Sequence, residues 1–255
     1  RIILYYIYMN VKNIKSFIDF YKSLEISMCI APFPRFLNNE KQKEPILKKL
    51  NPPTRAQNHN KKKDEKLKEL IEEIKDTKCD LKDVATNTVF SDGPNDSKIM
   101  LIGEAPGADD DRIGKPFVGQ AGQLLDKMFD SINLSRKKNF YITNLVFWRP
   151  PGNRTPNKQE ISTCLPLTKK HISIINPRLL ILLGNVASQS ILSSKEGINV
   201  LRKKENYFID EALGLKIPVK AIFHPAYLIR NPIEKKTMWT DLLDIDEFIL
   251  TNNII

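Results

Sequence analysis

A short run of glycine, proline and carboxylate residues is the part of this sequence best suited to chemistry. The segment Gly103-Glu104-Ala105-Pro106-Gly107 follows an apolar run at 99–102, and three aspartates follow it at 109–111. A short apolar run bounded by glycine is typical of a buried strand. Open α/β folds bind their ligands at the carboxyl edge of parallel strands. The segment therefore predicts a polar pocket at such an edge, and an ordinary acidic loop is the alternative interpretation.

Three more polar loops follow apolar runs further along the chain. They begin at Thr143-Asn144 and continue to Arg154, at Gly184-Asn185, and at His224-Pro225. A binding pocket needs polar groups that converge from several elements. Four such loops at one sheet edge are stronger support for a functional site than the first loop alone.

The elements that would position these loops alternate along the chain. Strands are expected at 98–103, 140–146, 179–184 and 219–223, and helices at 119–131, 158–175, 184–193 and 236–250. Residues 200–217 are interpreted as a hairpin or short irregular strands. Alternating strands and helices indicate a parallel sheet covered on both faces. We therefore expect an α/β fold, a three-layer α/β/α arrangement with a small four-stranded parallel central sheet.

The first quarter of the chain differs from the rest in composition. Residues 1–37 are expected to form an N-terminal helical segment, with one amphipathic helix at 9–29. Residues 38–63 are rich in Asn, Lys, Gln and Pro, which predicts a flexible basic linker. Residues 64–255 would then form the α/β domain, beginning with a helix at 64–75 that packs on its core.

Charge and composition favour a protein that meets nucleic acid inside the cell. The formal net charge is +10, and residues 136–204 hold 13 basic residues against only two acidic ones, Glu160 and Glu196. Such a block is typical of a surface for the phosphate backbone, although lysine-rich solvation is the alternative. The three cysteines lack a disulfide-like spacing, which predicts a reducing cytosol and a cytoplasmic location. No apolar run approaches the roughly 18–20 residues of a membrane span.

The loop residues resemble the family 4 uracil-DNA glycosylases of bacteria and archaea. The resemblance covers residues 79 to 250 and is carried by several stretches in the family's order and spacing. They are Gly103-Glu104-Ala105-Pro106-Gly107, Pro116-Phe117-Val118-Gly119, Ile142-Thr143-Asn144, Arg149-Pro150-Pro151 with Asn153-Arg154, and His224-Pro225-Ala226-Tyr227-Leu228. The resemblance implies a monofunctional glycosylase that releases uracil from DNA and leaves an abasic site. A glycosylase for hypoxanthine or other deaminated bases, and a non-catalytic DNA-damage-binding protein of the same fold, remain alternatives.

The resemblance also implies roles for individual residues in the reaction. His224 would donate a hydrogen bond to uracil O2 as negative charge develops there, and Glu104 would position water or stabilise the cationic sugar. Ala105 stands where the better-known uracil glycosylases have an aspartate. Three more side chains would contact the base: Asp110 near the C5 edge, Phe117 by stacking, and Asn144 by reading N3–H and O4.

The DNA itself would be held by residues around these loops. Arg149, Arg154 and Arg230 are candidates for phosphate contacts, and Leu228 resembles the wedge that fills the gap left by an extruded nucleotide. The implied partner is uracil-containing DNA, with no membrane involved, and we expect a monomer.

The family's four-iron, four-sulfur cluster is the point at which this chain departs from the pattern. Of the four cysteine positions, Cys79 and Cys164 match, whereas the other two are Asp76 and Trp148. Two thiolates are insufficient for four-cysteine ligation, and Cys29 lies far away in the sequence. We therefore expect no cluster and no metal, with Cys79 and Cys164 as reduced core thiols or a lone close pair.

Overall fold

A five-stranded sheet organises the part of the chain that the structure describes. The computed structural model describes residues 54–255, so the expected helix at 9–29 lies outside the described residues. The strands are β1 (Ile99–Gly103), β2 (Phe140–Asn144), β3 (Leu179–Leu183), β4 (Asn206–Asp210) and β5 (Leu215–Ile222), in the order β2-β1-β3-β5-β4. Every residue of β1, β2 and β3 is buried, as expected for parallel strands covered on both faces.

The sheet has one strand more than the four predicted. β1, β2, β3 and β5 are parallel to their neighbours among these four, whereas β4 runs antiparallel to β5 at one edge. In β4 only Phe208 is buried, because an edge strand has one face and one edge toward solvent. The hairpin formed by β4 and β5 lies where the sequence predicted a hairpin or short irregular strands, at 200–217, and β4 adds the fifth strand to the sheet.

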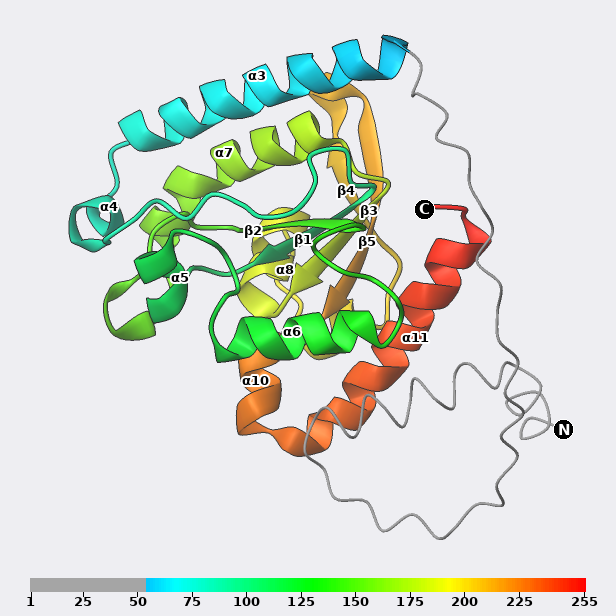
Figure 1. Cartoon of the computed structure of the whole chain (residues 1–255). Coiled ribbons are helices and arrows are strands. Elements are labelled where there is room, and N and C mark those ends of the chain that lie inside the picture. Colours follow the sequence, from blue (N-terminus) through cyan, green and yellow to red (C-terminus); the bar gives the residue numbers. More distant parts are fainter. Residues whose placement is uncertain (1–53) are drawn as a thin grey trace, which may run out of the picture. The chain divides into compact units, whose positions relative to one another are not determined.

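Helices cover both faces of the sheet (Figure 1). On one face lie α3 (Thr54–Asp76), α7 (Lys158–Ile175) and α8 (Asn185–Leu192), whose apolar side chains share a core with Met100 and Ile102 of β1. On the other face lie α6 (Gln120–Asp130) and α11 (Lys235–Thr251). The shorter helices are α4 (Asp80–Val84), α5 (Ala108–Ile113), α9 (Ile198–Leu201) and α10 (Pro225–Arg230), with 3-10 turns η1 (Pro151–Asn153), η2 (Glu211–Leu213) and η3 (Pro232–Glu234).

Local signals explain which helix boundaries were predictable. α7 begins after Asn157, whose side chain accepts from the Glu160 amide while the Glu160 carboxylate accepts from the Asn157 amide. It ends at Asn176 in the left-handed conformation, so its bounds match the expected 158–175. By contrast, α3 begins at Thr54, ten residues before the expected start and inside the segment predicted as a linker. The polar residues of its first turns carry no apolar stripe that would have revealed the helix.

Within residues 54–255, no helix is long and apolar enough to cross a membrane.

Candidate functional site

The loops after β1, β2 and β5, together with the start of α6, line a cavity of about 470 Å³. Most of the predicted site residues line it, namely Glu104, Ala105, Asp110, Phe117, Arg154, His224 and Arg230. The predicted loop at Gly184-Asn185 does not line this cavity. Gly184 instead packs against His224, which does line it. A Cβ on Gly184 would lie 2.9 Å from Cβ of His224, so glycine makes room for the histidine.

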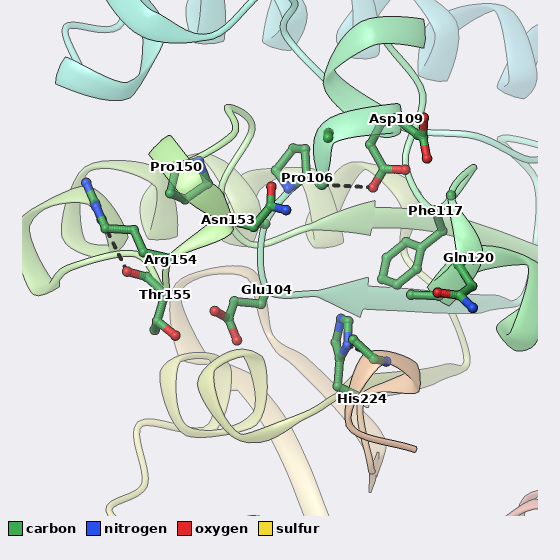
Figure 2. A pocket seen from close by; sticks show the side chains of 18 of the residues that line it. Glu104, Pro106, Asp109, Phe117, Gln120, Pro150, Asn153, Arg154, Thr155 and His224 are labelled. Carbon is green, nitrogen blue, oxygen red and sulfur yellow. Dashed lines mark hydrogen bonds between the residues drawn. The ribbon is translucent and has the colours of Figure 1, made fainter. Parts of the chain in front are cut away.

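Glu104 follows the last residue of β1 and is half-buried at the cavity wall. Its backbone carbonyl accepts from the Val146 amide (3.1 Å), which continues the pairing of the two strands beyond their ends. Burial raises the pKa of Glu104 above its ordinary value, while a hydrogen bond from Thr155 and the charge of Arg230 act in the opposite direction. Figure 2 shows Glu104 beside Thr155. The carboxylate is thus a partly desolvated acid or base within the cavity.

His224 lies two residues after the end of β5 and is the N-cap residue of α10. Its Nδ1 accepts a hydrogen bond from the Ala226 amide at 3.2 Å. A backbone N–H can only donate, so the neutral ring carries its proton on Nε2. Burial lowers the pKa of His224 to about 4; Arg230 acts in the same direction and Asp110 opposes it. At neutral pH this residue is therefore an uncharged imidazole with a fixed tautomer.

Phe117 faces His224 across the cavity (Figure 2), with ring centroids 5.7 Å apart and ring planes at 36°. The residue is 5% exposed and has a φ of 56°, in the left-handed region that a phenylalanine rarely adopts. The arrangement presents an aromatic face beside the histidine, as stacking on a planar ligand requires.

Asn144, the last residue of β2, is fully buried, and neither its amide oxygen nor its amide nitrogen has a hydrogen-bond partner among the described residues. A Cβ on Gly103 would lie 2.4 Å from both Asn144 Oδ1 and Phe117 Cζ. The amide therefore lies directly against the β1 end and the Phe117 ring. Buried polar groups are almost always paired, so this amide is suited to pairing with a ligand.

The carboxylate of Asp110 organises the first loop. One oxygen accepts from the Gly107 amide (3.2 Å) and the other from the Val118 amide (2.8 Å). Asp110 lines the cavity, as does Ala105. Its contact with the C5 edge of the base stays a prediction. In the structure its carboxylate joins the two ends of the loop by accepting from Gly107 and Val118.

The three candidate arginines have different surroundings. Arg230 is exposed at the cavity. Arg149 donates to Asn153 Oδ1 (2.7 Å) and does not line the cavity. Arg154 donates to both carboxylate oxygens of Glu160, at 2.9 and 2.6 Å, so its guanidinium already has a bidentate partner. Their phosphate contacts remain predictions, and Arg154 is the least available of the three.

Leu228, the candidate wedge residue, is buried in this structure. It is 0% exposed, because it is on the inner face of α10, which packs against α6. Its neighbours Tyr227 and Ile229 are partly exposed. The role of Leu228 as the wedge that fills the gap left by an extruded nucleotide stays a prediction.

Sequence reasoning missed two residues that serve the site. Thr155 contacts Glu104, and Arg136 donates to the backbone carbonyls of Pro116 and Phe117. Thr155 follows Arg154 in a loop already singled out, so its position was an available signal. No spacing pattern connects Arg136 to the residues that it contacts.

Comparison with known proteins agrees with this site. The family model described as the uracil DNA glycosylase superfamily matches residues 90–243. The chain belongs to this superfamily. A type-4 uracil-DNA glycosylase of Archaeoglobus fulgidus is 38% identical over 186 residues, covering 72% of this chain and 93% of the relative. Type-4 enzymes of Pyrobaculum aerophilum (35%, covering 70% and 90%) and Thermotoga maritima (38%, covering 66% and 85%) are also similar.

The positions of the superfamily's type-4 cluster ligands do not fit an iron–sulfur cluster here. Burial raises the pKa of Cys164 to about 12, and its neighbour Cys79 acts in the same direction, so this thiol stays protonated. Trp148 is 1% exposed, and its indole N–H donates to Thr88 Oγ1 at 3.0 Å. Among the described residues, no three His, Cys, Asp or Glu side chains lie together so as to hold a metal ion. A packed indole and two thiols occupy the place where four thiolates would be needed.

Proposed function

We propose that this protein hydrolyses the N-glycosidic bond of deoxyuridine in DNA, releasing uracil and leaving an abasic site for base excision repair. The observation that carries the proposal is the pairing, in one cavity, of a neutral histidine whose proton is on Nε2 with the half-buried carboxylate of Glu104. The similarity to type-4 uracil-DNA glycosylases supports the same reaction.

In the proposed reaction the bond between C1′ of the sugar and N1 of uracil breaks first. The electron pair leaves with the base, so negative charge develops on uracil O2 while the sugar becomes cationic. His224 Nε2–H donates to O2, and the carboxylate of Glu104 stabilises the cation, orients the water that attacks C1′ and accepts the proton which that water loses. Because these groups are already in place, little reorganisation is needed as charge develops.

Recognition of the base falls to Asn144 and Phe117. The amide oxygen of Asn144 accepts from uracil N3–H and its nitrogen donates to O4. Cytosine presents the opposite pattern and would leave buried groups unpaired. Phe117 stacks on the base after it has been flipped out of the helix, since the target atom is out of reach in the stack. Arg149 and Arg230 contact phosphates, and the protein acts as a monomer in the cytoplasm.

The test is a release assay with purified protein in the presence of EDTA, on matched oligonucleotides. These contain deoxyuridine, deoxyinosine, deoxycytidine or thymidine at one position, as single strands and as duplexes. Uracil release alone supports the proposal. Release of hypoxanthine with no uracil would replace the substrate, and tight binding of damaged DNA without release would replace the enzyme with a binding protein.

We further propose that the protein works without an iron–sulfur cluster, because only two thiols stand at the four ligand positions, the other two being an exposed Asp76 and the buried Trp148. Anaerobic purification followed by iron and acid-labile sulfide analysis should find neither at a stoichiometric level. About four irons per chain, as the family's cluster contains, would overturn the proposal.

A further inference from the structure

The conformation of Phe117 needs an explanation from outside the cavity. Its φ of 56° lies in a region where a bulky residue is an outlier. Such conformations persist only where the surroundings determine them and are concentrated at ligand sites. Some residue must therefore hold the Phe117 backbone in this conformation while its ring faces His224.

Arg136 contacts the backbone of this segment directly. Its Nη1 donates to the Pro116 carbonyl at 2.9 Å and its Nη2 donates to the Phe117 carbonyl at 2.8 Å. The same guanidinium pairs with Asp126 Oδ1 of α6 at 2.9 Å through Nε, and with Asp92 Oδ2 at 3.5 Å. The Arg136 side chain is only 13% exposed, so these bonds are largely shielded from water.

The segment is also constrained from the other side. A Cβ on Gly122 would lie 1.8 Å from the Phe117 carbonyl oxygen, so α6 packs directly on this peptide. The next amide, that of Val118, donates to Asp110. Arg136 therefore holds two consecutive carbonyls, those of Pro116 and Phe117. The close packing of Gly122 and the hydrogen bond to Asp110 restrict movement of the same segment.

We propose that Arg136 is a positioning residue for base recognition: by holding the carbonyls of Pro116 and Phe117, it sets the Phe117 ring at its place opposite His224. The inference rests on the proposed function, because the ring's task is to stack on the flipped base. It concerns a residue that does not line the cavity. The planar fork of arginine can bind two carbonyls and a carboxylate together, whereas a lysine ammonium is a single point of attachment.

A double-mutant cycle tests the coupling between Arg136 and Phe117. Single-turnover uracil release is measured for wild type, Arg136→Gln, Phe117→Leu and the double variant, at a temperature where circular dichroism shows all four folded. We expect Arg136→Gln to lower the rate by about 10- to 100-fold, because small misplacements of a binding group cost this much. In the Phe117→Leu background the same change should cost less than about threefold, since coupled residues are not additive. Equal losses in both backgrounds would show a general structural role and overturn the proposal.

Two further variants separate geometry from charge and from stability. Arg136→Lys keeps the charge and should not restore the rate, whereas full rescue would contradict the fork geometry. Arg178→Gln is the matched control. Arg178 also donates to a backbone carbonyl, that of Asn253 at 3.1 Å, but it stands directly before the amino end of β3, whereas the cavity lies beyond the carboxyl ends of the strands. It should leave the rate unchanged.

Hydrogen exchange provides a readout that does not depend on catalysis. Arg136→Gln should speed amide exchange over residues 114–122, with β3 unaffected, and Arg178→Gln should leave 114–122 unchanged. Unchanged exchange of 114–122 in Arg136→Gln would overturn the proposal even if activity fell. If the wild type releases no uracil, the proposed function fails, while the exchange experiment still decides whether Arg136 holds this segment.

Discussion

Two buried residues only four positions apart, one at the end of β2 and one beyond it, have opposite surroundings. Asn144 is 0% exposed, and both polar atoms of its amide lack a partner within the described part of the chain. Trp148 is 1% exposed, and its one polar atom is paired with Thr88. An unpaired buried amide lowers the stability of the folded protein, so the amide of Asn144 is free to pair with a ligand. The indole N–H of Trp148 is already paired and stabilises the fold.

The comparison separates what this chain shares with the type-4 enzymes from what it lacks. On the cavity side, the residue types that the chemistry needs are all present, and the structure brings Glu104, Phe117 and His224 to one cavity. On the side of Cys79 and Cys164, the described residues are held by apolar packing and by the hydrogen bond from Trp148 to Thr88. Substitutions on the two sides should therefore have different consequences, for rate on one side and for stability on the other.

The largest expected effect is on rate and comes from His224. The His224→Ala variant should release uracil on the order of 10²–10³ times more slowly, the usual cost of losing one electrostatic donor at a developing anion. Its folding should be little changed. Single-turnover release measures the effect, with thermal unfolding as the check on structure. Release at the wild-type rate would remove the leaving-group role.

Asn144 should show loss of rate without loss of stability. In Asn144→Leu the base loses both hydrogen bonds, and uracil release should fall about 10- to 100-fold. Because the substitution also removes two unpaired buried polar atoms, the free energy of unfolding should stay the same or rise by about 1 kcal/mol. Denaturant unfolding and single-turnover release on the same preparation test both statements. A marked destabilisation would show that Asn144 is needed to terminate β2 rather than to read the base.

Asn144→Asp is the more specific variant at this position. It removes the donor toward O4, so uracil release should fall steeply, with at most weak cytosine release appearing. Undiminished uracil release would place base recognition elsewhere.

Trp148 should show loss of stability without loss of rate. Trp148→Ala removes a fully packed indole, and the free energy of unfolding should fall by about 3–5 kcal/mol, as for other large-to-small core changes. At a temperature where the variant is folded, the rate of uracil release should change less than about threefold, since additive behaviour is expected for sites without shared partners. Chemical unfolding and single-turnover kinetics provide the two numbers. A rate loss as large as that of Asn144→Leu would mean that the two regions are coupled.

The same contrast explains what could be predicted from the sequence. Glu104, Asn144 and His224 were found because they end strands, and the carboxyl ends of parallel strands meet at one edge. Helix α7 was found with its bounds because Asn157 and Glu160 form a local cap. Arg136 was missed because its partners are backbone carbonyls twenty and nineteen positions away. The burial of Leu228 was not predicted, because a six-residue helix gives too little periodicity to show which side faces inward. β4 was expected only as part of a hairpin or irregular strands and not as a strand of the central sheet, because only one of its residues is buried.

The smallest expected effect is the response of the rate to pH near neutrality. Burial holds the pKa of His224 at about 4, so the imidazole stays neutral well below the ordinary histidine value of about 6.5. The rate of single-turnover release should therefore change less than about twofold between about pH 6 and 8, where an ordinary histidine would titrate. Protonation would also require Nδ1 to give up the bond from Ala226. A step in rate centred near the ordinary value would show that His224 is solvated and that its tautomer is not fixed.

The free energy of unfolding should depend on pH between about 4 and 6.5, the folded and unfolded pKa values of His224. His224 binds a proton less readily when folded than when unfolded, so the unfolded state holds more protons between the two pKa values. Stability should rise with pH across that window and be lost as the pH falls from about 6.5 toward 4. His171, whose pKa burial lowers to about 3, should add to the same trend. Replacing His224 with glutamine should reduce the slope of unfolding free energy against pH, leaving the contribution of His171. An unchanged slope would assign the whole dependence to His171 and leave His224 free to titrate normally.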